Sequence, residues 1–123
     1  MPRAEILLYR ERDVVPVRDW LDALQPEARR RCQERLSLLA LRGHELRRPA
    51  VAPVVGGLFE LRVKHRRLNL RMLYFFHRRV AVIVSNGFVK QQAAIPLQEI
   101  RLALERKTRF EADPVLHASR FEG

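Results

Sequence analysis

One stretch of the sequence, residues 61–90, carries eight basic side chains and no Asp or Glu. Its apolar and polar residues alternate, which predicts β-strands. The alternation places Arg62 and Lys64 on one strand face, and a turn at residues 65–67 places Arg71 opposite Arg62. Like charges so placed repel, which favours a site for an external anion over a solvated face whose charges spread apart. The eight basic residues are Arg62, Lys64, Arg66, Arg67, Arg71, Arg78, Arg79 and Lys90.

The overall charge indicates the same kind of partner. The 123 residues include 24 Lys plus Arg and 14 Asp plus Glu, a formal net charge of +10. This excess on one small domain favours a polyanion, and nucleic acid before an anionic membrane. The apolar runs are too short to span a membrane, and the N-terminus has no secretory signal pattern. With Cys32 as the only cysteine, we expect a cytoplasmic protein without an intrachain disulfide.

The other reactive side chains do not form a recognised catalytic pattern. The four histidines lack paired metal spacing and there is one cysteine, so we expect neither a metal nor a cofactor. The general base is not evident from the sequence. Glu60 shares a strand face with Arg62, where basic surroundings would keep it a weak base. His65 or His77 could serve if a turn folds over the site.

The elements that position these residues are predicted in the order β-α-α-β-β-β-α. A short strand at residues 6–9 precedes two helices, which begin at Pro16 and Pro26, and the second ends near Gly43. Residues 44–57 are predicted to be a connection. Three strands then form an antiparallel meander, whose last strand ends near residues 86–87.

A last helix is predicted to open at Pro96. Its buried stripe would be Leu97, Ile100, Ala103 and Leu104. The pattern therefore predicts an α+β fold in which helices cover one face of an antiparallel sheet. We expect a single small domain over residues 1–112 and a frayed tail over residues 113–123.

Four segments in this order resemble the phage-derived HigB-like toxins of the RelE/ParE superfamily. They are GLFELR at 57–62, RMLYFF at 71–76, NGFVK at 86–90, and Pro96 followed by Glu99, Ile100 and Ala103. The resemblance covers residues 6–109 and implies a small RelE-like domain. It also implies a toxin of a type II toxin–antitoxin system. Such toxins are commonly mRNA endoribonucleases that act on the ribosome, and a cognate antitoxin, expected here to be a helix-turn-helix protein, neutralises them.

The resemblance also implies which residues form the site. Arg62, Arg71 and Lys90 match the motif positions of the basic residues that bind and cleave RNA, and Lys64 is added because of its face and proximity. Such cleavage needs no metal, because the RNA 2′-OH is the nucleophile and cations stabilise the charge that develops. The remaining residues predicted to bind RNA are Arg66, Arg67, Phe88 and Gln91.

Two features depart from the family pattern. Asn86 stands where members commonly have His, and residues 91–95 lack the usual Lys-rich and Thr-rich segment. Two alternatives stay open beside the endoribonuclease, the first because of these departures and the second because part of the superfamily poisons gyrase instead of cutting RNA. One is a non-catalytic nucleic-acid-binding module, and the other is a ParE-like toxin that targets gyrase.

Overall fold

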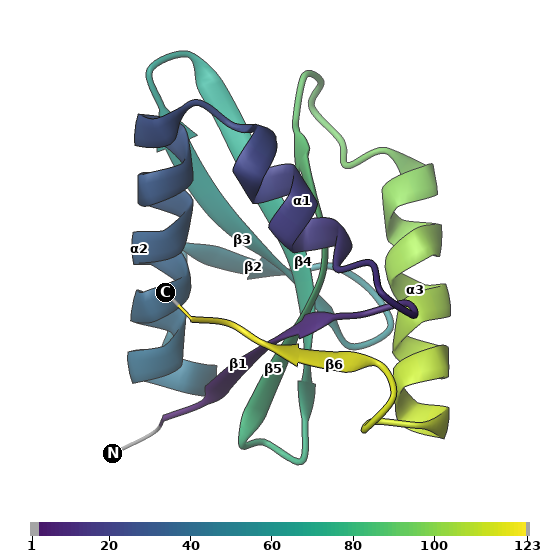
Figure 1. Cartoon of the computed structure of the whole chain (residues 1–123). Helices are drawn as coiled ribbons and strands as arrows, with labels where there is room; N and C mark the ends of the chain where they lie inside the picture. The colour runs from purple at the N-terminus through teal and green to yellow at the C-terminus, as the bar shows by residue number, and fades with distance from the viewer. Residues whose placement is uncertain (1–2, 123) are drawn as a thin grey trace.

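A six-stranded sheet runs through the molecule in the order β2-β3-β4-β5-β1-β6 (Figure 1). The computed structural model describes residues 3–122. Neighbouring strands are antiparallel except β1 and β5, which are parallel. The predicted α+β class is thus confirmed. The strands are β1 (Glu5–Tyr9), β2 (Val51–Pro53), β3 (Leu58–His65), β4 (Leu68–His77), β5 (Ala81–Val89) and β6 (Ala118–Arg120).

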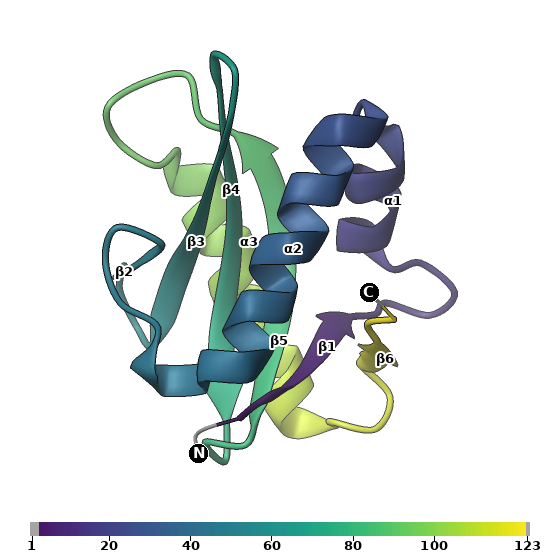
Figure 2. The ribbon, with the colours of Figure 1, turned by 90° about the vertical axis from the view of Figure 1, so that its left-hand side faces the viewer.

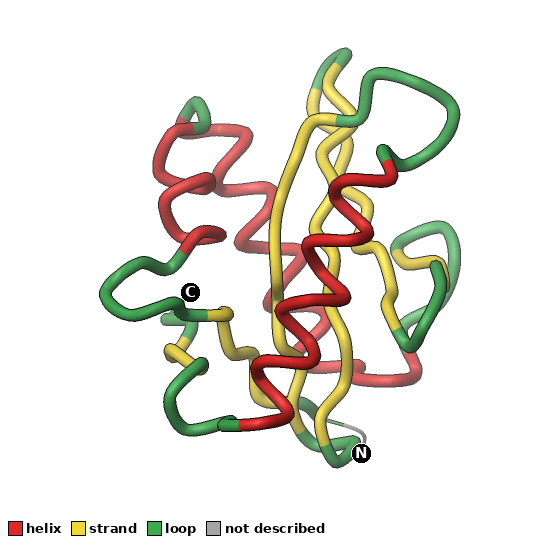
Figure 3. Tube along the Cα trace, turned by 90° about the vertical axis from the view of Figure 1, so that its right-hand side faces the viewer, coloured by secondary structure: helices red, strands yellow, loops and turns green. Residues whose placement is uncertain are grey.

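Helices cover both faces of this sheet, whereas the sequence analysis predicted one covered face. Helices α1 (Pro16–Ala23) and α2 (Pro26–Arg42) lie on one face (Figure 2), and α3 (Leu97–Ala112) lies on the other (Figure 3). The reason is that β4 is apolar on both faces. Met72 and Tyr74 pack in the core under α1 and α2, while Leu73 and Phe75 pack in a second core under α3. Each apolar face must be buried, so each needs a helical layer.

The buried stripe of α3 also differs from its prediction. Ala103 is buried, and Ile100 and Leu104 pack beside it. Leu97, however, is 66% exposed, and Phe110 instead anchors the C-terminal end of the helix against Phe75. Leu97 is the first residue of the helix and directly follows the loop that connects β5 to α3, so it lies outside the second core. No helix between residues 3 and 122 is both long and apolar enough to cross a bilayer.

Two further strands lie where the sequence analysis predicted a connection and a frayed tail. Within the connection, β2 follows a short 3-10 turn, Gly43–Glu45, and pairs with β3. In the tail, β6 pairs with the outer edge of β1, so the fold continues past residue 112. The ring of His117 stacks on Tyr9 with centroids 5.2 Å apart, which holds the tail against the domain. Each of the two strands satisfies backbone groups along a strand edge that would otherwise be unpaired, β2 on β3 and β6 on β1.

Strand β5 continues to Val89 instead of ending near residues 86–87. Gly87 does not mark a turn here, because it lies under the ring of Trp20 from α1. A Cβ built on Gly87 would approach Trp20 Cδ2 and Cζ3 to 2.6 Å, well inside van der Waals contact. Glycine at this position therefore lets α1 pack directly on the strand.

Candidate functional site

Arg62 lies directly opposite Arg71 in the register of β3 and β4, as the alternation predicted. An acid lies with them, however. The Glu60 carboxylate accepts a hydrogen bond from Arg62 Nε at 2.7 Å, and its other oxygen lies 3.6 Å from Arg71 Nε. Glu60 immediately precedes the acid-free stretch and shares its strand face. The inference that this arginine pair lacks an internal counter-charge is therefore wrong.

The Glu60 carboxylate and the Arg71 guanidinium form the inner part of this cluster. Their side chains are 4% and 12% exposed, whereas Arg62 is 32% exposed. Burial lowers the pKa of Arg71, and the nearby Glu60 charge opposes that effect. Arg71 Nη1 also donates to the Leu70 carbonyl at 3.1 Å. One carboxylate thus orients two guanidinium groups and leaves the pair with a net positive charge.

A β-bulge in β5 brings Lys90 to the same side of the sheet. Tyr74 pairs with Val84 and Leu73 pairs with Asn86, so Ser85 is the extra residue between them. One extra residue exchanges the faces of all the residues that follow it. Lys90 then comes to lie beside Asn69, whose carbonyl accepts the Lys90 backbone N–H at 2.8 Å.

Helix α3 supports this bulge from the second core. Arg106 donates to the Ser85 carbonyl at 2.6 Å, and its guanidinium lies 5.3 Å from the centroid of the Tyr9 ring. Asn86 donates from Nδ2 to Glu99 Oε1 at 2.9 Å. The residue that stands at the usual histidine position therefore joins β5 to α3 and is buried.

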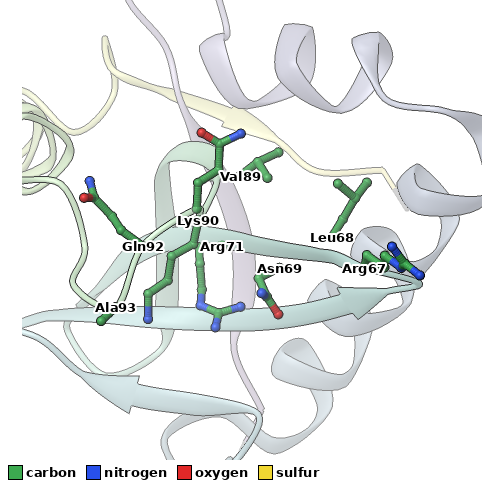
Figure 4. Close-up of a pocket in the computed structure, with 9 residues that line it drawn as sticks. Arg67, Leu68, Asn69, Arg71, Val89, Lys90, Gln92 and Ala93 are labelled. Atoms are coloured by element: carbon green, nitrogen blue, oxygen red, sulfur yellow. The ribbon is translucent and has the colours of Figure 1, made fainter.

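A cleft of about 590 Å³ opens beside Arg71 and Lys90 (Figure 4). Both side chains point the same way in this view, with Asn69 next to them. No acidic residue of the described chain lines the cleft. Its walls are Arg67, Leu68, Asn69, Arg71, Val89, Lys90, Gln91, Gln92 and Ala93.

A second cleft of about 320 Å³ lies at the outer edge of β3 and shares Asn69 and Arg71 with the first. Arg62 and Lys64 line this smaller cleft, together with Arg35 from α2. The four predicted catalytic residues therefore line two adjoining clefts: Lys90 lines the larger one, Arg62 and Lys64 line the smaller one, and Arg71 lines both. Such a concentration of cations suits a chain of phosphates better than a single small anion.

The four residues predicted to bind RNA lie in different places. Arg67 and Gln91 line the larger cleft. Arg66 is exposed at the β3–β4 turn, with φ at 56°, and lines neither cleft. Phe88 pairs with Arg71 in the register but is only 8% exposed and packs in the core under α3. Its ring packs against the sheet below the site and leaves no exposed face on which an RNA nucleobase could stack.

Neither histidine considered as a base lies at the site. His65 alternates with the rest of β3 toward α2, on the face that carries Val63, and is buried there. His77 lies at the far end of β4, with its ring centroid 5.0 Å from that of Phe110. Within residues 3–122, no three His, Cys, Asp or Glu side chains converge to hold a metal ion.

Three residues of the site were not found from the sequence. Asn69 joins the two clefts, and the alternation that assigned Arg71 already placed it on the same face. Glu60 was considered only as a base, although its position two residues before Arg62 signals an ion pair. No local sequence pattern places Arg35 at the site, because it comes from α2 and contacts Arg62, which is 27 residues later in the chain.

A known protein family matches the part of the chain that contains both clefts. A family described as phage-derived protein Gp49-like matches residues 19–108, which include every residue that lines the two clefts. The chain belongs to this Gp49-like family. Gp49-like proteins are a RelE/HigB-like toxin family of toxin–antitoxin systems, so the coarse part of the sequence interpretation is confirmed. No curated protein matches the chain.

Proposed function

We propose that this Gp49-like protein is a HigB-like toxin that cleaves mRNA on the ribosome, as a metal-independent endoribonuclease, and so stops translation in the cytoplasm. One observation carries the proposal. Arg62, Lys64, Arg71 and Lys90 line two clefts that meet at Arg71, and no carboxylate among the described residues lines either cleft. Glu60 offsets only one of these four positive charges, so a phosphodiester chain would supply the remaining negative charge.

The site fits a cleavage in which RNA provides its own nucleophile. The 2′-OH attacks the adjacent phosphorus, the bond to the 5′-oxygen of the next nucleotide breaks, and the products are a 2′,3′-cyclic phosphate and a 5′-OH. Arg71, held by Glu60 and by the Leu70 carbonyl, is placed to stabilise the charge that develops on the phosphorane. Lys90 lies beside Arg71 in the larger cleft and Arg62 lies beside it in the smaller one, so both would add positive charge near the reacting phosphate. The proton leaves the 2′-OH to water or to a group of the ribosome, and the leaving 5′-oxygen takes one up.

Sequencing of transcript ends after a short pulse of expression tests the proposal. The wild type should create new message ends that carry 5′-OH. Arg71→Gln should reduce their formation by about 10²–10³-fold, because it removes a preorganised donor to the developing charge. Arg101→Gln removes the same charge from the exposed side of α3, away from both clefts, and should leave cleavage unchanged.

A second candidate function is a nucleic-acid-binding module without cleavage. The burial of Asn86 against Glu99 favours it, since the usual histidine position carries an amide that faces the protein interior. This module would bind RNA with a steep dependence on salt but create no new ends. Growth arrest with intact messages and DNA damage would instead indicate a gyrase-targeting toxin.

The proposal includes a cognate antitoxin of the helix-turn-helix type. A toxin with a formal net charge of +10 favours an acidic covering surface. Co-expression of the neighbouring gene product should restore growth, and the two proteins should co-purify. Toxicity that no neighbouring product relieves would contradict this part of the proposal.

A further inference from the structure

The outer edge of β3 is covered along only part of its length. Strand β2 pairs with Phe59, Glu60 and Leu61. One more backbone bond, from the Arg62 N–H to the Ala50 carbonyl at 2.8 Å, ends this pairing. The smaller cleft opens where the pairing stops, between Pro49 and Lys64. An open strand edge beside a row of cations can admit an extended ligand.

Arg35 reaches this edge from the opposite face of the sheet. Its Nη1 donates to the Arg62 carbonyl at 3.0 Å, which fixes the guanidinium against β3. One donor is used in this way, and a guanidinium has five. None of the ion pairs found among residues 3–122 involves Arg35 or Lys64. By contrast, Arg30 on the same helix pairs with two glutamates.

The geometry points to a second phosphate subsite, formed by Arg35, Arg62 and Lys64, beside the position at Arg71. This inference rests on the proposed function, because it takes the ligand to be the same RNA strand. The two clefts share Asn69 and Arg71, so one strand can pass from the larger cleft across Arg71 to the edge of β3. A fixed guanidinium with free donors suits the oxygens of a phosphodiester. The protein therefore grips a run of several nucleotides and not only the bond at Arg71.

Binding of 2′-O-methyl oligoribonucleotides tests this subsite without cleavage, because their 2′ oxygen cannot attack. The probes are a dinucleotide and an octanucleotide. Arg35→Gln should weaken octanucleotide binding about tenfold and reduce the salt slope by about 0.7, as expected for one lost phosphate contact on a single strand. Dinucleotide binding should stay within twofold. Lys64→Gln, which removes an exposed cation of β3, should also weaken octanucleotide binding.

Arg42→Gln is the matched control, since Arg42 lies on the same helix, is exposed and lines neither cleft. The inference is overturned if Arg35→Gln and Arg42→Gln weaken octanucleotide binding equally, because diffuse charge then explains the loss. It is also overturned if the Arg35→Gln loss is the same for both probes. Arg35→Lys keeps the positive charge and should retain part of the octanucleotide affinity. This result would show that the loss in Arg35→Gln comes from the missing charge and not from misfolding.

The two proposals fail in different ways. Octanucleotide binding that depends on Arg35, with no new message ends in cells, would refute the endoribonuclease and leave the subsite standing. New message ends with unchanged binding in Arg35→Gln would refute the subsite alone. A wild type that neither binds the octanucleotide nor creates new message ends would refute both.

Discussion

Replacing Glu60 with Gln tests the central contact of the site. The substitution keeps the size of the side chain and removes its charge. Glu60 is 4% exposed, accepts the 2.7 Å bond from Arg62 Nε and lies 3.6 Å from Arg71 Nε. In Glu60→Gln, two guanidinium groups that are paired in register would face each other without a counter-charge. We expect lower stability and a less well-fixed Arg71.

The size of the effect follows from the burial of the three groups. Losing one partner of a buried ion pair costs about 3–5 kcal/mol, and a hydrogen bond to a charged group contributes about 1.5–3 kcal/mol. Arg62 is 32% exposed, so water screens part of its charge, while Arg71 is 12% exposed and is screened less. We therefore expect a loss of about 2–3 kcal/mol. For a chain of this length, that lowers Tm by about 8–12 °C.

Thermal and urea unfolding of four proteins would measure this contribution: the wild type, Glu60→Gln, Arg71→Gln and the double variant. The two substitutions should be non-additive, because removing Arg71 also relieves its repulsion from Arg62. Glu34→Gln is the control, since it breaks an exposed pair with Arg30 and should leave Tm almost unchanged. A Tm loss below about 2 °C in Glu60→Gln, or an additive cycle, would refute the role assigned to this carboxylate.

Three further predictions concern the support of the site. Gly87→Ala should cost about 1–3 kcal/mol in urea unfolding, because the new Cβ overlaps the Trp20 ring. Arg106→Gln should speed hydrogen exchange of residues 85–90, since it weakens the bond to the Ser85 carbonyl that holds the bulge. Burial raises the pKa of the Cys32 thiol from 9.0 to about 12, so thiol reagents at pH 8 should label only unfolded protein. Because the folded pKa is the higher one, this thiol's contribution to stability is present below pH 9.0 and is lost as pH rises toward 12.

The local pattern of the sequence was enough to predict the hairpin at the centre of the site. Alternation in β3 and β4, with a short turn between them, placed Arg62 opposite Arg71, and the structure has the same register. The prolines at 16 and 26 likewise marked the starts of α1 and α2, and Gly43, with φ at 55°, follows α2 as its C-cap. These features depend on neighbours in the chain, which is why periodicity and turn residues reveal them.

The features that the sequence did not reveal depend on contacts between distant segments. The alternation of β5 stops at Ser85, and a bulge cannot be distinguished from the end of a strand without knowing the register with β4. Arg35 donates to a carbonyl 27 residues away. The tail has no periodicity of its own and becomes a strand only because β1 offers an unpaired edge. In each case contacts between distant segments determine the structure, and local sequence propensity does not predict it.

The bulge explains how one sheet face can serve both as core and as site. Before Ser85, the residues of β5 that face α3, such as Ile83, are apolar and pack in the core. After it, without the extra residue, Lys90 would share the face of Val84, under α1. With it, Phe88 continues the core beneath α3, while Lys90, two residues further along the same face, reaches solvent beside Arg71. The bond from Arg106 to Ser85 therefore links the packing of α3 to the position of a cation in the cleft. Charges that the fold holds in place before a ligand arrives need little reorganisation when negative charge develops, which is the property that phosphodiester cleavage by cations requires.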